Sequence, residues 1–427
     1  MHAKIKKLYL QNIQTETKHP FIQILLLILA GESVFILPFV LTRVFRPTYL
    51  TVFELTNEQL GICASIFGFV AIAAYIFGGF IADKFQPKNL IGAALILTSL
   101  GGFYLSTLPG FMGVCFLYGY WGFTSIFLLW AAMIKATRIW GGDKGQGKAF
   151  GLLDGGRGLV GALISTLAVA IFIETLGKPS EIANLTEKGE AFKNVLLMSS
   201  SFVALVGLLI FGLFKKVESG SSVAVKLKEM LATFKFPQVY LLAGIVFCAY
   251  SAYRLTDIIP QFAHEIGGMD EVFTSEISTV MLYGRAAVGF GLAYFADKTN
   301  HFNLLKIGFV LIAISCILYL ILGSAVSSLI IFALPTVMIA LGVYAARVLY
   351  FSVIAKSRIP LAVTGSAVGM ISVIGYTPDI YFGIVSGYFL DNYGYEDGFI
   401  ANFIMVFCLA LIGLFFVFRL KKIAENE

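Results

Sequence analysis

The chain has 427 residues and a formal net charge of +6, and only 13% of its residues are charged whereas 58% are hydrophobic. Soluble domains carry about a quarter charged residues, so a soluble fold of this size would expose more apolar surface than it could bury. The composition predicts an integral membrane protein and excludes a soluble enzyme.

Twelve apolar segments are expected to cross the membrane as helices, because a bilayer core requires about 20 helical residues. They lie near 21–42, 58–82, 89–107, 111–134, 150–176, 193–214, 237–263, 273–296, 304–324, 328–354, 362–390 and 398–418. The first carries Glu32 and is too long for the apolar region of a signal peptide, so we expect it to be retained. The prediction is an all-α integral membrane protein with 12 transmembrane helices.

Lys and Arg are distributed unequally between the two sides of these spans. The segments on the side of the termini (1–20, 83–88, 135–149, 215–236, 297–303, 355–361 and 419–427) hold 21 of them, and the connections on the other side hold 4. Because Lys and Arg accumulate in cytoplasmic loops, the N and C termini are predicted to be cytoplasmic. The positive charge therefore indicates topology and not a nucleic-acid partner.

The most polar internal segment, 215–236, lies between the sixth and seventh spans. Gly and Ser follow two Lys at its start, as in a linker, and VAVKLKEMLATF can form an amphipathic helix on the membrane surface. This cytoplasmic linker divides the chain into an N-terminal six-helix bundle (1–214) and a C-terminal six-helix bundle (237–427). Two such parallel repeats can rock against each other around a central site.

A short motif recurs once in each half. GGFIADKFQPK at 78–88 and GLAYFADK at 291–298 each end an apolar run, and the aspartates of the two copies are 214 residues apart. A small residue lets two helices approach, and a carboxylate can accept hydrogen bonds from the amides at a helix N-terminus. We predict that Gly79, Asp83, Lys84, Asp297 and Lys298 form a gate between the two bundles.

The first copy resembles the loop signature of the major facilitator superfamily, Gly-x-x-x-Asp-Arg/Lys followed by a basic residue, and lies between spans two and three as it does there. The copy in the second half has Ala293 at the glycine position. The resemblance covers the whole chain in topology. It implies two six-helix bundles and transport of a small-molecule substrate by alternating access.

Arginines inside the spans are the best indicators of function, because an Arg at the bilayer centre costs at least ~2.5–3.5 kcal/mol on insertion scales. Arg43 and Arg254 are 211 residues apart, close to the repeat offset. Two guanidiniums facing each other across the bundle interface would suit a phosphate or carboxylate. Two other interpretations stay open: the arginines snorkel toward the headgroups, or Arg254 pairs with Asp257.

A second resemblance concerns the same two arginines. YLTVFELTNEQLG (49–61), DIIP (257–260) and Arg138 are similar to the organophosphate:phosphate antiporter branch of the superfamily. That branch holds phosphate with one Arg from span one and one from span seven, which implies this role for Arg43 and Arg254. Both are displaced by two or three positions from the places that the branch uses.

Further in-span residues complete the predicted substrate and coupling site. Arg285 lies near the middle of the eighth span and is expected to contact substrate or to pair with Glu32 or Asp379 on another helix. Glu32 and Asp379 are candidate proton carriers, because a low-dielectric environment favours the neutral carboxyl. The alternative is a hydrogen-bonded carboxyl without a coupling role. Tyr253 and Tyr283 are expected to line the substrate cavity.

Asp154 and Arg157 are three residues apart in GLLDGGRG, so they share a helix face and can neutralise each other. They lie near the cytoplasmic end of their span, which favours a structural pair or a part of the inter-bundle gate over substrate contact. The same interpretation applies to Arg347.

No catalytic, metal-binding or cofactor-binding motif accompanies these residues. The five Cys and four His lack metal-ligand spacing, and no phosphate-binding or dinucleotide-binding fingerprint is present. We expect no enzyme activity, no cofactor and no metal. The hypothesis is a monomeric secondary transporter of the bacterial inner membrane, surrounded by the lipid bilayer, that moves a small anionic metabolite with H+ or a counter-anion. The alternatives are a proton-coupled symporter of a neutral sugar or nucleoside, and a transporter-like membrane sensor.

Overall fold

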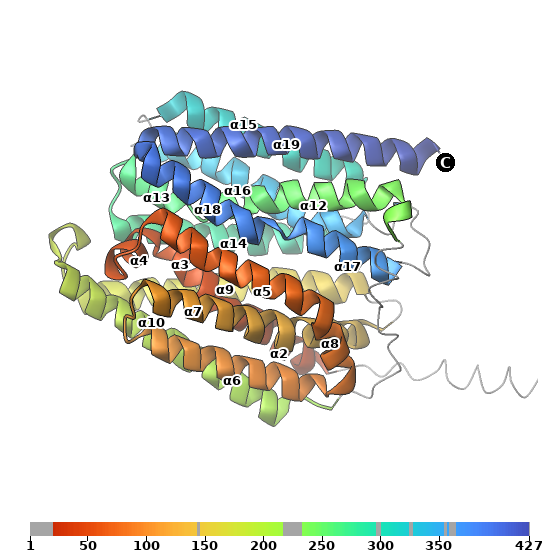
Figure 1. Cartoon of the computed structure of the whole chain (residues 1–427), viewed down its shortest axis with the longest axis horizontal. Coiled ribbons are helices and arrows are strands. Elements are labelled where there is room, and N and C mark those ends of the chain that lie inside the picture. The colour runs from red at the N-terminus through yellow and green to blue at the C-terminus, as the bar shows by residue number, and fades with distance from the viewer. Residues whose placement is uncertain are drawn as a thin grey trace, which may run out of the picture.

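The computed structural model describes residues 20–142, 146–216, 233–295, 300–323, 328–353, 357 and 364–426. These residues form helices and short connections, and the long helices run roughly along one common direction (Figure 1). We call the end of the molecule that holds α4 and α13 the α4–α13 end. The opposite end, with α8, α17 and the C-terminus, is the α8–α17 end (Figure 1).

The first half of the chain folds into a connected set of helices. They are α2 (Phe21–Phe35), η1 (Ile36–Val40), α3 (Leu41–Val44), α4 (Arg46–Val52), α5 (Asn57–Lys84), α6 (Pro87–Leu105), α7 (Phe111–Gly122), η2 (Phe123–Trp130), α8 (Ala131–Gly141), α9 (Gln146–Leu176), η3 (Ser180–Ile182) and α10 (Leu185–Leu213). The turn η1 is a π-helical turn that contains Pro38. Proline has no N–H to donate, so the first apolar segment changes its winding between Glu32 and Arg43.

The second half repeats this pattern. Its helices are η4 (Thr233–Lys235), α12 (Pro237–Leu255), α13 (Ile259–Glu265), α14 (Glu271–Phe295), α15 (His301–Leu322), α16 (Leu329–Ser352), α17 (Thr364–Gly375), α18 (Pro378–Asn392) and α19 (Gly394–Asn426). The segment expected as one span at 362–390 is interrupted: α17 ends at Gly375 and α18 begins at Pro378. Pro378 removes a backbone donor at this place, which puts Asp379 in the first turn of the new helix.

Ten stretches among the described residues are long and apolar enough to cross a membrane: Phe21–Val44, Asn57–Tyr75, Pro87–Leu105, Phe111–Gly141, Ala149–Leu176, Leu185–Leu213, Pro237–Glu265, His301–Leu322, Ile330–Tyr350 and Gly394–Glu425. They coincide with ten of the twelve expected spans. The expected spans at 273–296 and 362–390 correspond to α14 and to the pair α17 and α18.

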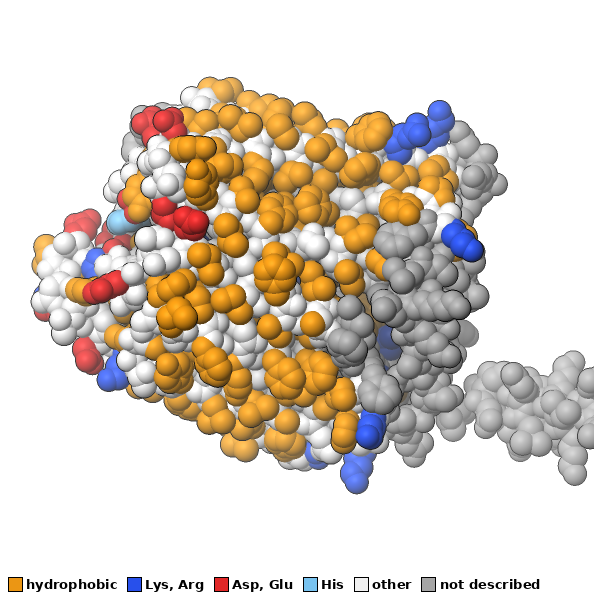
Figure 2. All heavy atoms as spheres, in the orientation of Figure 1, with side chains coloured by type: hydrophobic (Ala, Val, Ile, Leu, Met, Phe, Trp, Pro, Cys, Tyr) orange, Lys and Arg blue, Asp and Glu red, His pale blue; other side chains and the backbone are white. Residues whose placement is uncertain are grey.

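The surface agrees with a membrane environment. Hydrophobic side chains cover the flank of the molecule between its two ends, while acidic side chains gather at the α4–α13 end and basic ones at the α8–α17 end (Figure 2). The flank includes large exposed apolar residues such as Ile321, Ile330 and Met112. Apolar surface of this extent is stable in contact with lipid rather than water.

The buried apolar side chains of the described residues form two clusters. One runs from Ile24 to Phe214 and takes in Leu282, and the other runs from Val239 to Leu420. Two helix pairs join them: α5 packs on α18, and α9 packs on α14. At the α5–α18 crossing a Cβ on Gly61 would lie 2.2 Å from the carbonyl oxygen of Gly383, so only glycine permits this approach.

Candidate substrate and coupling site

Polar contacts close the interface at the α4–α13 end. Arg46 donates from Nε to Oε1 of Gln261 at 2.8 Å and from Nη2 to Oδ1 of Asn57 at 3.1 Å. Glu271 at the start of α14 accepts from the hydroxyl of Thr48 at 3.0 Å and from Nζ of Lys188 at 2.7 Å. The contacts of Arg46 with Gln261 and of Glu271 with Thr48 and Lys188 join segments that lie in different halves of the chain.

Asp391 at the end of α18 completes this closure. Its Oδ1 accepts from the backbone N–H and the side-chain amide of Asn57, at 3.2 and 3.0 Å, and its Oδ2 accepts from the N–H of Glu58 at 2.7 Å. The carboxylate thus caps the N-terminus of α5, where the helix dipole favours a negative charge. A side chain of one half therefore terminates a helix of the other.

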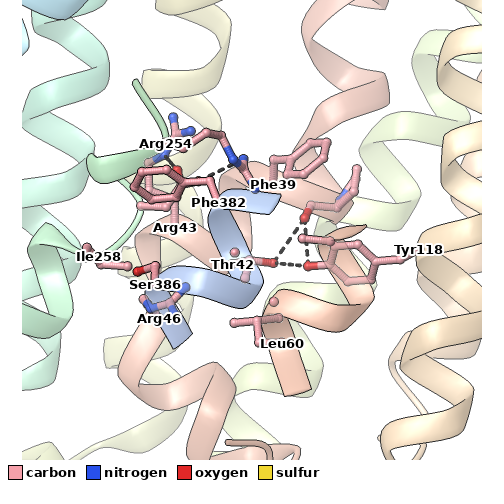
Figure 3. A pocket seen from close by; sticks show the side chains of 15 residues that line it. Phe39, Thr42, Arg43, Arg46, Leu60, Tyr118, Arg254, Ile258, Phe382 and Ser386 are labelled. Carbon is pink, nitrogen blue, oxygen red and sulfur yellow. Dashed lines mark hydrogen bonds and ion pairs between the residues drawn. The ribbon is translucent and has the colours of Figure 1, made fainter. Parts of the chain in front are cut away.

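Just inside this closed end lies a small cavity of about 40 Å³. Figure 3 shows Arg43, Arg46 and Arg254 on one side of it and Tyr118 on the other, with Thr42 between them. The hydroxyls of Thr42 and Tyr118 are 3.1 Å apart, and Tyr118 also donates to the carbonyl of Pro38 at 3.0 Å. Ligand sites occupy about 300–1,000 Å³, so the cavity in this conformation holds water at most.

The first charged cluster brings Arg43 and Arg254 onto one carboxylate. Nε of Arg43 lies 2.5 Å from Oδ1 of Asp257, and Nη1 of Arg254 lies 2.8 Å from Oδ2. Arg254 also approaches Asp379 at 3.6 Å, and Tyr250 donates to Asp379 at 3.2 Å. The pairing of Arg254 with Asp257, one of the interpretations from the sequence, is thus present.

Helix breaks position this cluster. Asp257 lies between the end of α12 at Leu255 and the start of α13 at Ile259, and Asp379 lies just after the break between α17 and α18. Arg43 is in the last turn of α3, before the break at Phe45. Broken membrane helices place helix ends and unpaired backbone groups in the interior, where ion and ligand sites form.

The second charged cluster is centred on Glu32, which is 1% exposed. Its Oε2 accepts from Nε of Arg157 at 3.2 Å, and its Oε1 lies 3.1 Å from Nη1 of Arg285. Arg285 reaches Asp154 as well, at 3.5 Å. The direct Asp154–Arg157 pair expected from their spacing is replaced by pairs with other helices, because α2 and α14 present partners on either side of α9.

The two tyrosines expected to line the substrate cavity lie in different surroundings. Tyr253 is buried, and the guanidinium carbons of Arg43 and Arg347 lie 4.6 and 4.0 Å from the centre of its ring. Tyr283 is 37% exposed, and its hydroxyl is 3.0 Å from that of Thr166 on α9. The structure therefore brings Tyr253 into the charged interior and leaves Tyr283 at its edge.

The predicted inter-bundle gate lies mostly outside the described part of the chain. Asp297 and Lys298 are outside the described residues, and for Gly79 and Asp83 only the backbone at the end of α5 is described. Lys84 is exposed, with its Nζ 5.8 Å from the centre of the Phe85 ring. The gate function of this motif stays a prediction.

The interactions that sequence reasoning missed are those of Arg46, Lys188, Glu271 and Asp391. The residues that pair are far apart in the chain: Arg46 and Gln261 by 215 positions, Asn57 and Asp391 by 334. No short-range spacing signals such contacts, although Arg46 was recognisable as a charge at the end of a span.

The described residues form a helical fold with arginines and carboxylates in its interior and an apolar flank (Figure 2), as in a multi-pass membrane protein. A family model described as Major Facilitator Superfamily matches residues 24–380. The chain belongs to this family. Its membership indicates a transporter rather than an enzyme.

Relatives and solved structures agree with this assignment. The inner membrane protein YihN of Escherichia coli (strain K12) is 26% identical over 426 residues, which cover 96% of this chain and 98% of that protein. The inner membrane protein YqcE of the same organism is 24% identical over 375 residues, 85% of each chain. Because both relatives are inner membrane proteins of a bacterium, the similarity supports a bacterial inner membrane as the location of this protein.

Among solved structures, a point mutant of the nucleoside transporter NupG superposes with a TM-score of 0.72 at 14% identity, over 93% of this chain and 99% of that chain. A bacterial homolog to the human lysosomal transporter Spinster, in an inward-facing and unoccupied conformation, gives 0.70 at 16% identity, over 94% and 97%. At such low sequence identities, the similarity shows that the folds are alike and does not extend to the substrate.

Proposed function

We propose that the protein is a secondary active transporter of a small anionic metabolite, such as an organophosphate, a sugar acid or a carboxylate, and that it works by alternating access. One observation carries the proposal: among the described residues, arginines outnumber carboxylates in the interior between the helices. The arginines are Arg43, Arg46, Arg157, Arg254, Arg285 and Arg347, and the carboxylates are Glu32, Asp154, Asp257, Glu271 and Asp379.

Charge that is buried without a counter-charge is costly in a low-dielectric interior. Among the described residues, the hydrogen-bond partners of Arg46 are two neutral amides, and the guanidinium of Arg347 contacts aromatic rings and forms no ion pair. A bound anion supplies the missing negative charge, whereas a neutral solute leaves the excess in place. The charge balance therefore favours an anionic substrate.

The proposed architecture has 12 transmembrane helices, with α14 and the broken pair α17 and α18 completing the ten apolar stretches. It divides at the linker 215–236 into bundles 1–214 and 237–427, in a monomer. The excess of Lys and Arg in the connections at the α8–α17 end supports cytoplasmic termini. The closed α4–α13 end then faces outward.

Within this architecture, Arg43, Arg254 and Arg285 bind the anion together with Tyr253. Glu32 and Asp379 are the proposed proton carriers of a symport cycle, and Gly79, Asp83, Lys84, Asp297 and Lys298 the gate at the cytoplasmic end. Opening of the α4–α13 end has to separate Arg46 from Gln261 and Lys188 from Glu271. Anion exchange is the alternative to proton symport.

A neutral sugar or nucleoside is the second candidate substrate. It is favoured by the pairing of Arg43, Arg157, Arg254 and Arg285, since each already has a carboxylate within 3.2 Å. In that case the arginines balance acids and bind no ligand. The similarity of fold to NupG, a nucleoside transporter, is compatible with it.

Ligand binding to the purified protein separates these candidates. A ligand that binds the folded state raises its apparent stability by RT ln(1 + [L]/Kd), so thermal unfolding in detergent is followed with inorganic phosphate, a sugar phosphate, gluconate, methanesulfonate, glucose and a nucleoside. We expect stabilisation by one class of anion, and its loss in Arg254→Ala and Arg285→Ala. Stabilisation by a neutral solute that persists in both variants contradicts the proposal.

Transport in proteoliposomes then assigns the coupling. Uptake of the stabilising compound that accelerates under a pH gradient, acidic on the side of entry, indicates proton symport. Uptake that needs an anion on the opposite side and no pH gradient indicates exchange.

A further inference from the structure

Arg347 on α16 differs from the other interior arginines in its surroundings. Arg43, Arg157, Arg254 and Arg285 each form an ion pair, and Arg46 donates hydrogen bonds to the side-chain amides of Gln261 and Asn57. Among the described residues, no carboxylate lies within ion-pair distance of Arg347. Its guanidinium lies instead 4.0 Å from the ring centre of Tyr253 and 5.9 Å from that of Tyr250. An aromatic ring attracts a cation but does not neutralise its charge.

Two hydrogen-bond donors in the neighbourhood of Arg347 have no acceptor among the described residues. Nη2 of Arg43 and the hydroxyl of Tyr344 are buried and have no hydrogen-bond partner among the described residues. Tyr344 precedes Arg347 by three positions on α16, so both side chains are on one helix face, and it is 1% exposed. Leaving a buried donor unpaired costs about 1–3 kcal/mol, so an acceptor is expected at this place in a working cycle.

The two guanidiniums lie close together despite their like charge. Both approach the ring of Tyr253, so their carbons are separated by at most 8.6 Å, the sum of the two distances to its centre. Guanidinium N–H groups donate to an anionic oxygen at about 2.7–2.9 Å. A single phosphate, sulfonate or carboxylate group is thus large enough to accept from both.

The ion pairs of Asp257 occupy two of the guanidiniums that could otherwise bind an anion. Its two oxygens already accept from Arg43 and Arg254 at 2.5 and 2.8 Å, so the pair expected from the sequence to hold an anion holds the protein's own carboxylate. Arg254 is engaged by Asp379 as well. Arg46 already donates to the amide oxygens of Gln261 and Asn57. Among the described interior arginines, the one with neither an ion pair nor a hydrogen-bond acceptor is therefore Arg347, which is partly buried.

We propose that Arg347 binds the oxyanion group of the substrate, with Nη2 of Arg43 and the hydroxyl of Tyr344 as further donors. This inference rests on the proposed function and adds a residue that the sequence analysis had interpreted as structural. Arg43 belongs to the first half of the chain and Arg347 and Tyr344 to the second. The bound anion therefore joins the halves, and its release frees them to separate.

The test measures the affinity of the anion that stabilises the wild-type protein, taken from the phosphate, sugar phosphate, gluconate and methanesulfonate series, by calorimetric titration. We expect Arg347→Gln to weaken binding about 100-fold and Arg347→Lys about 10-fold, because lysine keeps the charge and loses the two-pronged geometry. Tyr344→Phe, which keeps the ring, is expected to weaken binding about 5-fold. Arg419→Gln, which removes a positive charge from the exposed surface of α19, is the control and is expected to bind like wild type.

The outcomes distinguish this inference from the function on which it rests. If Arg347→Gln fails to fold, the Arg347→Lys and Tyr344→Phe affinities decide. Anion binding that is unchanged within twofold in Arg347→Lys and Tyr344→Phe, with loss of binding in Arg254→Ala, overturns the role of Arg347 and leaves the anion transporter standing. If only neutral solutes bind the wild-type protein, the proposed function and the role of Arg347 both fail.

Discussion

Glu32 and Arg285 form an ion pair at 3.1 Å that joins α2 to α14, two helices that belong to different halves of the chain. The same carboxylate accepts from Arg157 on α9 at 3.2 Å. One acidic group therefore holds two guanidiniums in a nearly solvent-free interior. The geometry makes Glu32 the central contact of the second charged cluster.

Replacement of Glu32 by Gln is expected to destabilise the protein strongly. The variant keeps the shape but leaves Arg157 without its only ion-pair partner among the described residues, and removing one partner of a buried pair costs about 3–5 kcal/mol. Thermal unfolding in detergent measures the effect as a lower midpoint. Glu276→Gln on the exposed face of α14 is the control, and equal midpoints for the two variants would contradict the assignment.

Replacement of Asp257 by Asn is expected to increase the affinity for anions. Arg43 and Arg254 lose the carboxylate that both contact, so a dissolved anion no longer competes with an internal one. A gain of about 1.4 kcal/mol corresponds to a tenfold lower Kd, and calorimetric titration measures it. Glu425→Gln, at an exposed residue of α19, serves as control. An affinity that falls in Asp257→Asn would show that this carboxylate supports the bound ligand instead of replacing it.

Replacement of Asp391 by Asn is expected to favour opening of the α4–α13 end. The carboxylate caps α5 from the other half of the chain, and loss of a helix cap costs about 0.5–2 kcal/mol, equivalent to about a 2- to 30-fold change in the opening equilibrium. A cysteine at Ser386, which lines the small cavity, reports opening through its labelling rate with a membrane-impermeant maleimide.

The control for this experiment is Asp397→Asn, which removes an exposed carboxylate in the first turn of α19. We expect its labelling rate to match that of the parent protein. Equal labelling in Asp391→Asn and Asp397→Asn would mean that the cap does not hold the end closed.

A methyl group at Gly61 is expected to force α5 and α18 apart. Its Cβ would lie 2.2 Å from the carbonyl oxygen of Gly383, and backbone atoms cannot move aside as a side chain does. Gly61→Ala should lower the unfolding midpoint and abolish transport. Gly284→Ala, where the added atom meets nothing within 4 Å, should behave like wild type. Normal transport by Gly61→Ala would require a looser α5–α18 crossing than the one observed.

Composition and spacing by themselves determined the class of this protein. A low charged fraction and apolar stretches of bilayer length predicted a multi-pass membrane protein. The resemblance of the Gly-x-x-x-Asp-Lys motif at 79–84 to the loop signature of the major facilitator superfamily predicted the family, and the match over residues 24–380 confirms it. The composition and the apolar stretches are local features, because a helix that satisfies its own backbone groups can be exposed to lipid over its whole length.

Only the tertiary structure decided which charges meet. The three-residue spacing of Asp154 and Arg157 predicted a pair, yet Arg157 pairs with Glu32 and Asp154 with Arg285. Helix rotation and the distance between helices select these partners, and neither follows from spacing within one helix. The same holds for Asp257. The spacing within its segment allowed a pair with Arg254, whereas its second pair, with Arg43 of the other half, follows from the tertiary structure.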